Sequence, residues 1–144
     1  MSSLLFVALI GGMFGALVGW GGLLATVLIA RNGGTPYDEQ RLSSDADVHG
    51  IVERWASANG YERVDDHEGR RVYRKGKGLV TAPMFLEVSN GPEYIFRSYT
   101  RFNALVMKAD MALGGGGFVG VVPRNLAKKA QNTLFAELGL PGIA

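Results

Sequence analysis

Hydrophobic and polar positions divide this chain into one unbroken apolar stretch and a longer part with regular alternation. The stretch Leu4–Ala30 contains no charged side chain. As a helix rising about 1.5 Å per residue it would reach roughly 40 Å, more than the hydrocarbon core of a bilayer, about 30 Å. It is too long for the apolar core of a secretory signal, and no basic residue precedes it. The pattern predicts a transmembrane anchor over residues 1–30.

Small residues gather on one face of this predicted helix. At 100° per residue, five of its glycines fall together: Gly11, Gly12, Gly15, Gly19 and Gly22. A face of small residues lets two helix backbones approach closely, which drives helix association inside a membrane. We therefore expect these glycines to dock on another transmembrane subunit or on a second copy of the chain.

The polar residues 31–44 predict a juxtamembrane linker, since they contain two adjacent glycines and a proline. Arg31 and Arg41 follow the apolar stretch closely, whereas residues 1–3 carry no basic charge. By the positive-inside rule, the C-terminal domain is expected in the cytoplasm of a single-pass membrane protein.

Helical spacing of apolar residues occurs in two segments of the remaining chain. The first runs from about Asp45 to Gly60, and Trp55 on its apolar face is expected in the core. The second runs from Pro123 to Gly139, with Arg124 facing water. Its expected buried stripe is Leu126, Ala127, Ala130, Leu134 and Leu138.

Alternation with a period of two separates these helices. It appears in four runs divided by turn residues: Tyr61–Val64, Arg70–Lys75, Leu79–Ser89 and Glu93–Asn103. One face of the alternation is charged, which is typical of an antiparallel sheet covered on one side. The fold class predicted for residues 45–144 is therefore α+β, an antiparallel β-meander flanked by two amphipathic helices.

The apolar segment Ala104–Val122 is harder to interpret. Lys108 and Asp110 argue against a second membrane span. We expect a strand or short helix, a loop at Gly114–Gly117 and a short strand up to Val122. A loop lying on the membrane surface is the alternative.

The residues present exclude cysteine-dependent catalysis and argue against a metal site or a phosphate-binding loop. The chain has no cysteine, so cysteine-dependent catalysis is excluded. Asp65–Glu68 resembles a solvated hairpin loop more than a metal site, and His49 with Glu53 lacks a third ligand. Gly114–Gly117 has no following lysine of a phosphate loop. We expect no catalytic residue, no metal and no cofactor.

One cluster of basic residues stands out: Arg70, Arg71, Arg74, Lys75 and Lys77. The favoured interpretation is an ordinary solvated sheet face. Contact with anionic lipid headgroups is the second interpretation, because the predicted anchor would hold the cluster near a bilayer. Binding of nucleic acid is disfavoured, since the net charge is only +2 and no recognition motif accompanies the cluster.

These observations favour a non-enzymatic accessory, scaffold or assembly subunit of a membrane complex, docked through its glycine face. The expected partners are the bilayer and other transmembrane subunits. The alternative is a membrane-tethered enzyme or a domain that binds a small molecule or lipid.

Overall fold

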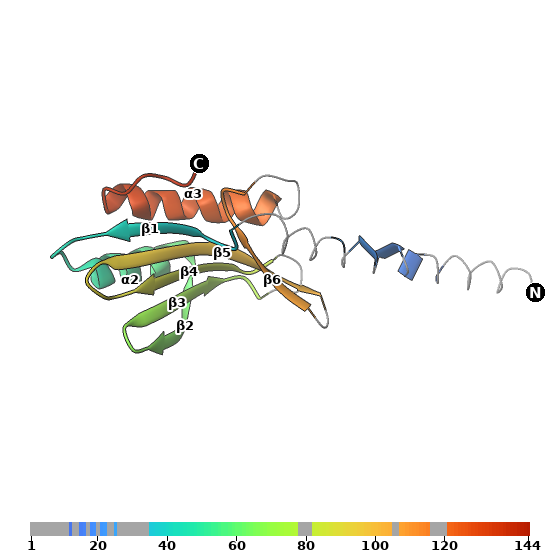
Figure 1. The fold of residues 1–144 in the computed structure, drawn as a ribbon, viewed down its shortest axis with the longest axis horizontal. Coiled ribbons are helices and arrows are strands. Elements are labelled where there is room, and N and C mark those ends of the chain that lie inside the picture. Colours follow the sequence, from blue (N-terminus) through green and yellow to red (C-terminus); the bar gives the residue numbers. More distant parts are fainter. Residues whose placement is uncertain are drawn as a thin grey trace, which may run out of the picture.

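The structure is a computed structural model that describes residues 35–77, 82–104, 107–115 and 121–144, with eight separate residues between 12 and 25. Six strands and two long helices make up the described domain (Figure 1). In chain order they are β1 (Asp38–Leu42), α2 (Val48–Asn59), β2 (Glu62–His67), β3 (Arg70–Lys75), β4 (Met84–Ser89), β5 (Tyr94–Ala104), β6 (Met107–Ala112) and α3 (Val121–Glu137).

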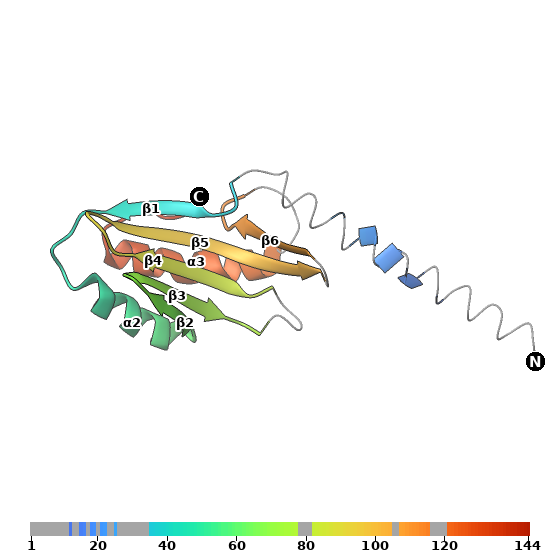
Figure 2. The same cartoon turned by 60° about the horizontal axis from the view of Figure 1, so that its bottom comes forward.

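All strand pairings are antiparallel, and the strand order is β1-β5-β4-β3-β2. Strands β2 to β5 form the predicted meander. The long strand β5 pairs with β1 along its first half and with β6 along its second half (Figure 2). Both short strands therefore share one edge of β5.

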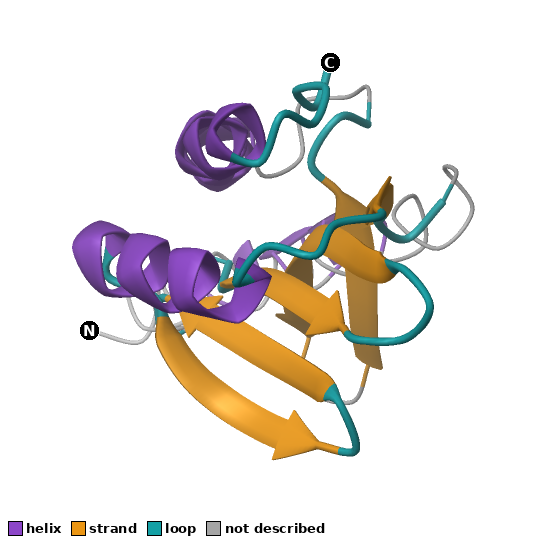
Figure 3. Ribbon diagram, turned by 90° about the vertical axis from the view of Figure 1, so that its left-hand side faces the viewer, coloured by secondary structure: helices purple, strands orange, loops and turns teal. Residues whose placement is uncertain are grey.

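Both helices lie on the same side of the sheet (Figure 3). Trp55 and Val52 of α2, and Leu134 and Phe135 of α3, join the sheet side chains in one core. Trp55 also donates from its indole nitrogen to the Ala130 carbonyl at 2.9 Å, which ties the two helices together. The predicted α+β domain, with an antiparallel sheet and two helices, is confirmed.

Local chemistry explains where the first helix begins and ends. The Asp47 side chain accepts a hydrogen bond from the Gly50 backbone nitrogen at 2.9 Å and caps the first turn of α2. Gly60 ends the helix in the left-handed conformation, as its sequence position predicts. The β2–β3 turn consists of Glu68 and Gly69, both with positive φ, which is the type I′ geometry of two-residue hairpins.

The buried stripe of α3 differs from the predicted one. Leu126 is 59% exposed, whereas Arg124 is buried. The Arg124 guanidinium donates to the Leu113 carbonyl at 3.3 Å, so a polar contact available only in the folded chain turns this side chain inward. The helix also begins at Val121, where a short strand was expected.

Two predictions about the N-terminal part need correction. The expected transmembrane helix is overturned, because the described residues include no helix long and apolar enough to cross a membrane. A span needs about 20 consecutive apolar residues, and α2 and α3 are amphipathic helices of 12 and 17 residues. Within the expected linker 31–44, residues Asp38–Leu42 form the strand β1.

Candidate functional site: the charged face of the sheet

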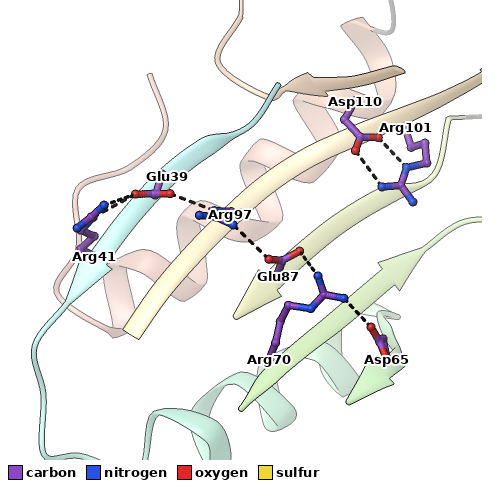
Figure 4. A network of polar contacts seen from close by, with 8 residues as sticks. All are labelled: Glu39, Arg41, Asp65, Arg70, Glu87, Arg97, Arg101 and Asp110. Atoms are coloured by element: carbon purple, nitrogen blue, oxygen red, sulfur yellow. Dashed lines mark hydrogen bonds and ion pairs between the residues drawn. The ribbon is translucent and has the colours of Figure 1, made fainter. Parts of the chain in front are cut away.

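The side of the sheet that neither helix covers carries a continuous row of ion pairs, which we call the charge ladder (Figure 4). Its members alternate in sign across the sheet: Arg41, Glu39, Arg97, Glu87, Arg70 and Asp65. Glu39 bonds Arg41 at 2.9 Å and Arg97 at 3.0 Å. At the other end, Arg70 bonds Asp65 at 2.8 Å. The ladder therefore spans five strands from β1 to β2.

Glu87 stands at the centre of this row. Its two oxygens lie 3.6 Å from Arg97 and 3.7 Å from Arg70. These distances are ion-pair distances rather than hydrogen bonds. Although its side chain is only 11% exposed, Glu87 lines the hollow described below.

Strand register produces the ladder. Glu39, Arg97 and Glu87 are direct neighbours on β1, β5 and β4, so their side chains leave the sheet on the same side. Asp65 of β2 lies opposite Val72 of β3, which in turn lies opposite Glu87 of β4, so Asp65 belongs to the same row. A bulge between Arg63 and Asp65 shifts the register of β2. Opposite charges in direct register stabilise an antiparallel pair, so the ladder also supports the sheet.

Beside the ladder, aromatic rings form an apolar floor. Phe85 and Tyr99 stack with ring centroids 5.1 Å apart, and Val72 and Tyr37 pack against them. The Arg101 guanidinium lies 4.9 Å from the Phe85 ring centroid and 5.5 Å from that of Tyr99. Such cation–π contacts hold a long side chain flat on the rings.

Asp110 fixes Arg101 in this position. The two side chains form a bidentate pair, with hydrogen bonds of 2.6 and 2.9 Å (Figure 4). Arg97 is held in a similar way, since its guanidinium lies 4.8 Å from the Tyr37 ring centroid while it bonds Glu39. The arginines of this face are therefore positioned before anything binds.

Ladder and floor together border a shallow hollow of about 430 Å³ that opens to solvent. Arg70, Arg97 and Arg101 line it, and so do the carboxylates of Asp65, Glu87 and Asp110. Its formal charge is balanced. We call the ladder, the floor and this hollow the charged face.

Two of the ladder carboxylates have a lowered pKa because arginines bond to them. Hydrogen bonds from Arg97 and then from Arg41 lower the pKa of Glu39. A hydrogen bond from Arg70 lowers the pKa of Asp65 in the same way. Both groups therefore lose their protons below the usual pH range of a carboxyl group.

The predicted basic cluster is divided between the two sides of the sheet. Arg70 belongs to the ladder. Arg71 faces the helix side, 3.6 Å from Asp66 and 3.8 Å from Glu53. Lys75 lies over the Tyr61 ring at 5.9 Å. Contact of this cluster, Arg74 and Lys77 included, with anionic lipid stays a prediction.

The other candidate ligands take structural positions. Glu53 accepts a hydrogen bond from Tyr73 at 3.0 Å and pairs with Arg63. Burial, with this bond to Glu53, raises the pKa of Tyr73 to about 12. His49 contacts Tyr94 edge to face. Nowhere in the described ranges do three or more His, Cys, Asp or Glu side chains gather as a metal site would need.

The predicted glycine sites are described only in part. Around Gly12, Gly15, Gly19 and Gly22 an added Cβ would meet open space. Gly11 lies outside the described part, as do Gly116 and Gly117 of the glycine loop. Docking through the glycine face therefore stays a prediction.

Sequence reasoning missed most of the charged face. It placed a charged side on the sheet, but it assigned Glu39 and Arg41 to a linker and left open whether Asp110 lies in a strand or in a short helix. The signal that would have found β1 is weak: in DEQRL, Glu39 and Arg41 alternate with Asp38, Gln40 and the single apolar residue Leu42. No family model, curated protein or solved structure matches the chain, so function has to be argued from the charged face itself.

Proposed function

We propose that the protein is a non-enzymatic accessory or scaffold subunit, and that its charged face binds the surface of another protein molecule. The observation that carries this proposal is the six-residue charge ladder on the uncovered side of the sheet. Its alternating charges favour a partner surface with the opposite alternation and oppose a surface of a single sign.

Preorganisation of the arginines supports this function. A flexible arginine loses rotamer freedom when it is fixed at an interface, at about 0.5–1.5 kcal/mol per side chain. Here Arg97 and Arg101 are already held by ring stacking and by carboxylate bonds. Much of that cost is met during folding, so more of the contact energy would remain for binding.

The composition of the face also suits a protein partner. Tyrosine, phenylalanine and arginine are enriched where protein interfaces concentrate their binding energy. The charged face combines Tyr37, Phe85 and Tyr99 with four arginines, and its hollow is broad and open to solvent. Small-molecule sites more often enclose most of their ligand.

Single thiols provide a direct test, because the chain contains no cysteine. Ser89→Cys places a thiol on the charged face, opposite Arg70 in the register. Ser57→Cys, on the exposed surface of α2, is the matched control. Maleimide labelling of each variant is timed in a native cell extract and with the purified full chain diluted to nanomolar concentration.

We expect labelling at Ser89→Cys to slow at least tenfold in the extract, while Ser57→Cys reacts at equal rates in both samples. The protected form should migrate as a species larger than one chain. Equal rates at Ser89→Cys would overturn the proposal. Protection in a species of single-chain size would also overturn it, in favour of the small-molecule alternative.

A further inference from the structure

Glu87, in the hollow of the charged face, is a carboxylate to which no described residue donates a hydrogen bond. The residue is 9% exposed, and its oxygens lie 3.6 Å from Arg97 and 3.7 Å from Arg70, too far for hydrogen bonds. We infer that the partner protein places an aromatic ring carrying an N–H or O–H group in the hollow, as the side chain of a tryptophan or tyrosine, and that this group donates to Glu87. The inference rests on the proposed function and names the group that anchors the partner.

The two neighbouring arginines are held away from Glu87 by other carboxylates. Arg97 donates to Glu39 at 3.0 Å, and Arg70 donates to Asp65 at 2.8 Å. Because the hollow opens to solvent, water can donate to Glu87 in the free protein. A partner that displaces this water loses affinity unless one of its own groups donates in the same place. The partner group beside Glu87 therefore has to be a hydrogen-bond donor.

This donor has to be uncharged. Three arginines and three carboxylates line the hollow, so its formal charge is balanced before anything binds. A lysine or arginine of the partner beside Glu87 would lie close to the guanidinium groups of Arg97 and Arg70, and like charges oppose binding. The neutral donors among side chains are amides, aliphatic hydroxyls, the phenol of tyrosine and the indole of tryptophan.

Arg101 selects an aromatic ring from these neutral donors. The Phe85 ring lies 4.9 Å from the Arg101 guanidinium and covers one face of its plane, while Asp110 holds that plane by two hydrogen bonds. The Arg101 side chain lines the hollow and remains 34% exposed. Since a guanidinium plane stacks on aromatic rings, a second ring fits against its open side. An amide or aliphatic hydroxyl would gain nothing comparable there.

The spacing of Arg101 and Glu87 suits one ring. The two side chains lie apart on the charged face and border the same hollow (Figure 4). Phe85, which carries the Arg101 guanidinium, precedes Glu87 by two residues on β4, or about 7 Å along the strand. A ring and one hydrogen bond together span a distance of this order. Tryptophan and tyrosine are also enriched among the residues that dominate binding energy at protein interfaces.

Two indoles test the inference without the partner itself. Indole carries the N–H donor, whereas N-methylindole presents the same ring without it. Binding of each probe to the purified, isotope-labelled full chain is followed by the shifts of its amide NMR signals. We expect indole to bind with a dissociation constant of about 1–10 mM, the range for a ligand of about ten non-hydrogen atoms. N-methylindole should bind at least fivefold more weakly.

Three substitutions assign the two contacts. Glu87→Met removes the acceptor at similar volume, and Arg97 and Arg70 keep their other carboxylates, so indole should bind this variant as weakly as N-methylindole does. Arg101→Lys keeps the charge but loses the planar group, and both probes should bind at least threefold more weakly. Arg41→Lys is the matched control, since Arg41 belongs to the ladder but not to the lining of the hollow. It should leave both affinities unchanged.

Three results would overturn the inference. They are equal affinity of the two probes for the parent chain, no binding of indole at about 10 mM, and a preference for indole that persists in Glu87→Met. The comparison on the parent chain decides even if Glu87→Met fails to fold.

The test also separates the inference from the proposed function. Any of these three results, together with protection of Ser89→Cys in the cell extract, would leave the proposed function standing with a partner held by other groups. A preference for indole without protection of Ser89→Cys would overturn the proposed function, and the anchoring ring of a partner protein with it.

Discussion

His49 shows how a single partly buried side chain can link folding to pH. It lies in the first turn of α2 against Tyr94, and its Nδ1 atom is buried without a hydrogen-bond partner in the described structure. Burial lowers its pKa from 6.5, and the nearby Arg71 charge lowers it further. Asp47, Glu53 and Asp66 oppose this shift in part.

The sign of the pH effect follows from this shift. The folded protein binds the His49 proton less tightly than the unfolded chain does, so stability is complete above about pH 6.5 and falls below it. Urea unfolding between pH 7.5 and 5.5 should show this loss, and His49→Gln should remove it. The exposed His67 supplies the control, since His67→Gln should keep the parent profile. A loss that persists in His49→Gln would contradict this assignment.

Substitutions of Arg101 measure how much its ring stacking and its ion pair with Asp110 contribute to the stability of the fold. Arg101→Ala removes the partner of Asp110 and uncovers two rings, so the free energy of unfolding should fall by about 2 kcal/mol. Arg101→Lys keeps the charge but loses the planar fork, and about 1 kcal/mol should be lost. Among the described residues Arg41 bonds Glu39 alone, and its side chain is 63% exposed. Arg41→Ala should therefore cost less than about 0.5 kcal/mol in the same urea titration. Equal costs for Arg101→Ala and Arg41→Ala would show that the stacked pair adds nothing.

At the scale of elements, the β2–β3 hairpin depends on two residues with positive φ. Gly69 has φ 80°, and an added Cβ would lie 3.3 Å from the Asn90 carbonyl oxygen. Gly69→Ala should therefore lower the free energy of unfolding by about 1–2 kcal/mol. Glu68→Asn should raise it by about 0.5 kcal/mol, because asparagine adopts this conformation more readily.

Gly91 is the matched control for the hairpin. An added Cβ there would lie 3.7 Å from the Glu93 carbonyl oxygen, an ordinary contact. Gly91→Ala should change the unfolding free energy by less than about 0.5 kcal/mol. If Gly69→Ala were equally mild, the turn would have to adopt another type in solution.

Elements differ in how far their own sequence determines them. The cap at Gly60, the core position of Trp55 and the strand period of β3 to β5 depend on local residues, and they agree with the structure. The buried face of α3 does not depend on local residues alone, since Arg124 turns inward only where the Leu113 carbonyl is present to accept its hydrogen bond. Similarly, β1 exists because β5 offers a paired edge, and its own five residues are mostly polar.

The charge ladder belongs to the scale of the whole molecule. Glu39 and Arg97 are 58 residues apart in sequence and 3.0 Å apart in the fold. Periodicity in the sequence predicted a charged side of the sheet, but the order of signs across it depends on strand order, on register and on the bulge in β2. None of these can be read from one strand alone, so the candidate site emerged only in the assembled sheet.

The two sides of the sheet should respond differently to salt. The helix side is held by apolar burial of residues such as Leu86, Phe96 and Phe135, which salt screening does not weaken. The proposed binding of a partner protein to the charged face depends on charges near solvent. Screening shortens their range from about 10 Å at 0.1 M salt to about 3 Å at 1 M. Raising NaCl over this range should therefore weaken this binding at least tenfold.

Maleimide labelling of Ser89→Cys in the cell extract at each salt concentration measures this change, and urea unfolding of the purified full chain at the same concentrations is the internal control. The unfolding free energy should shift by less than about 1 kcal/mol, because exposed ion pairs contribute little to folding. Protection of Ser89→Cys that strengthens with salt would show that apolar contacts hold the partner. In that case the aromatic floor, rather than the alternating charges, would have to supply the recognition.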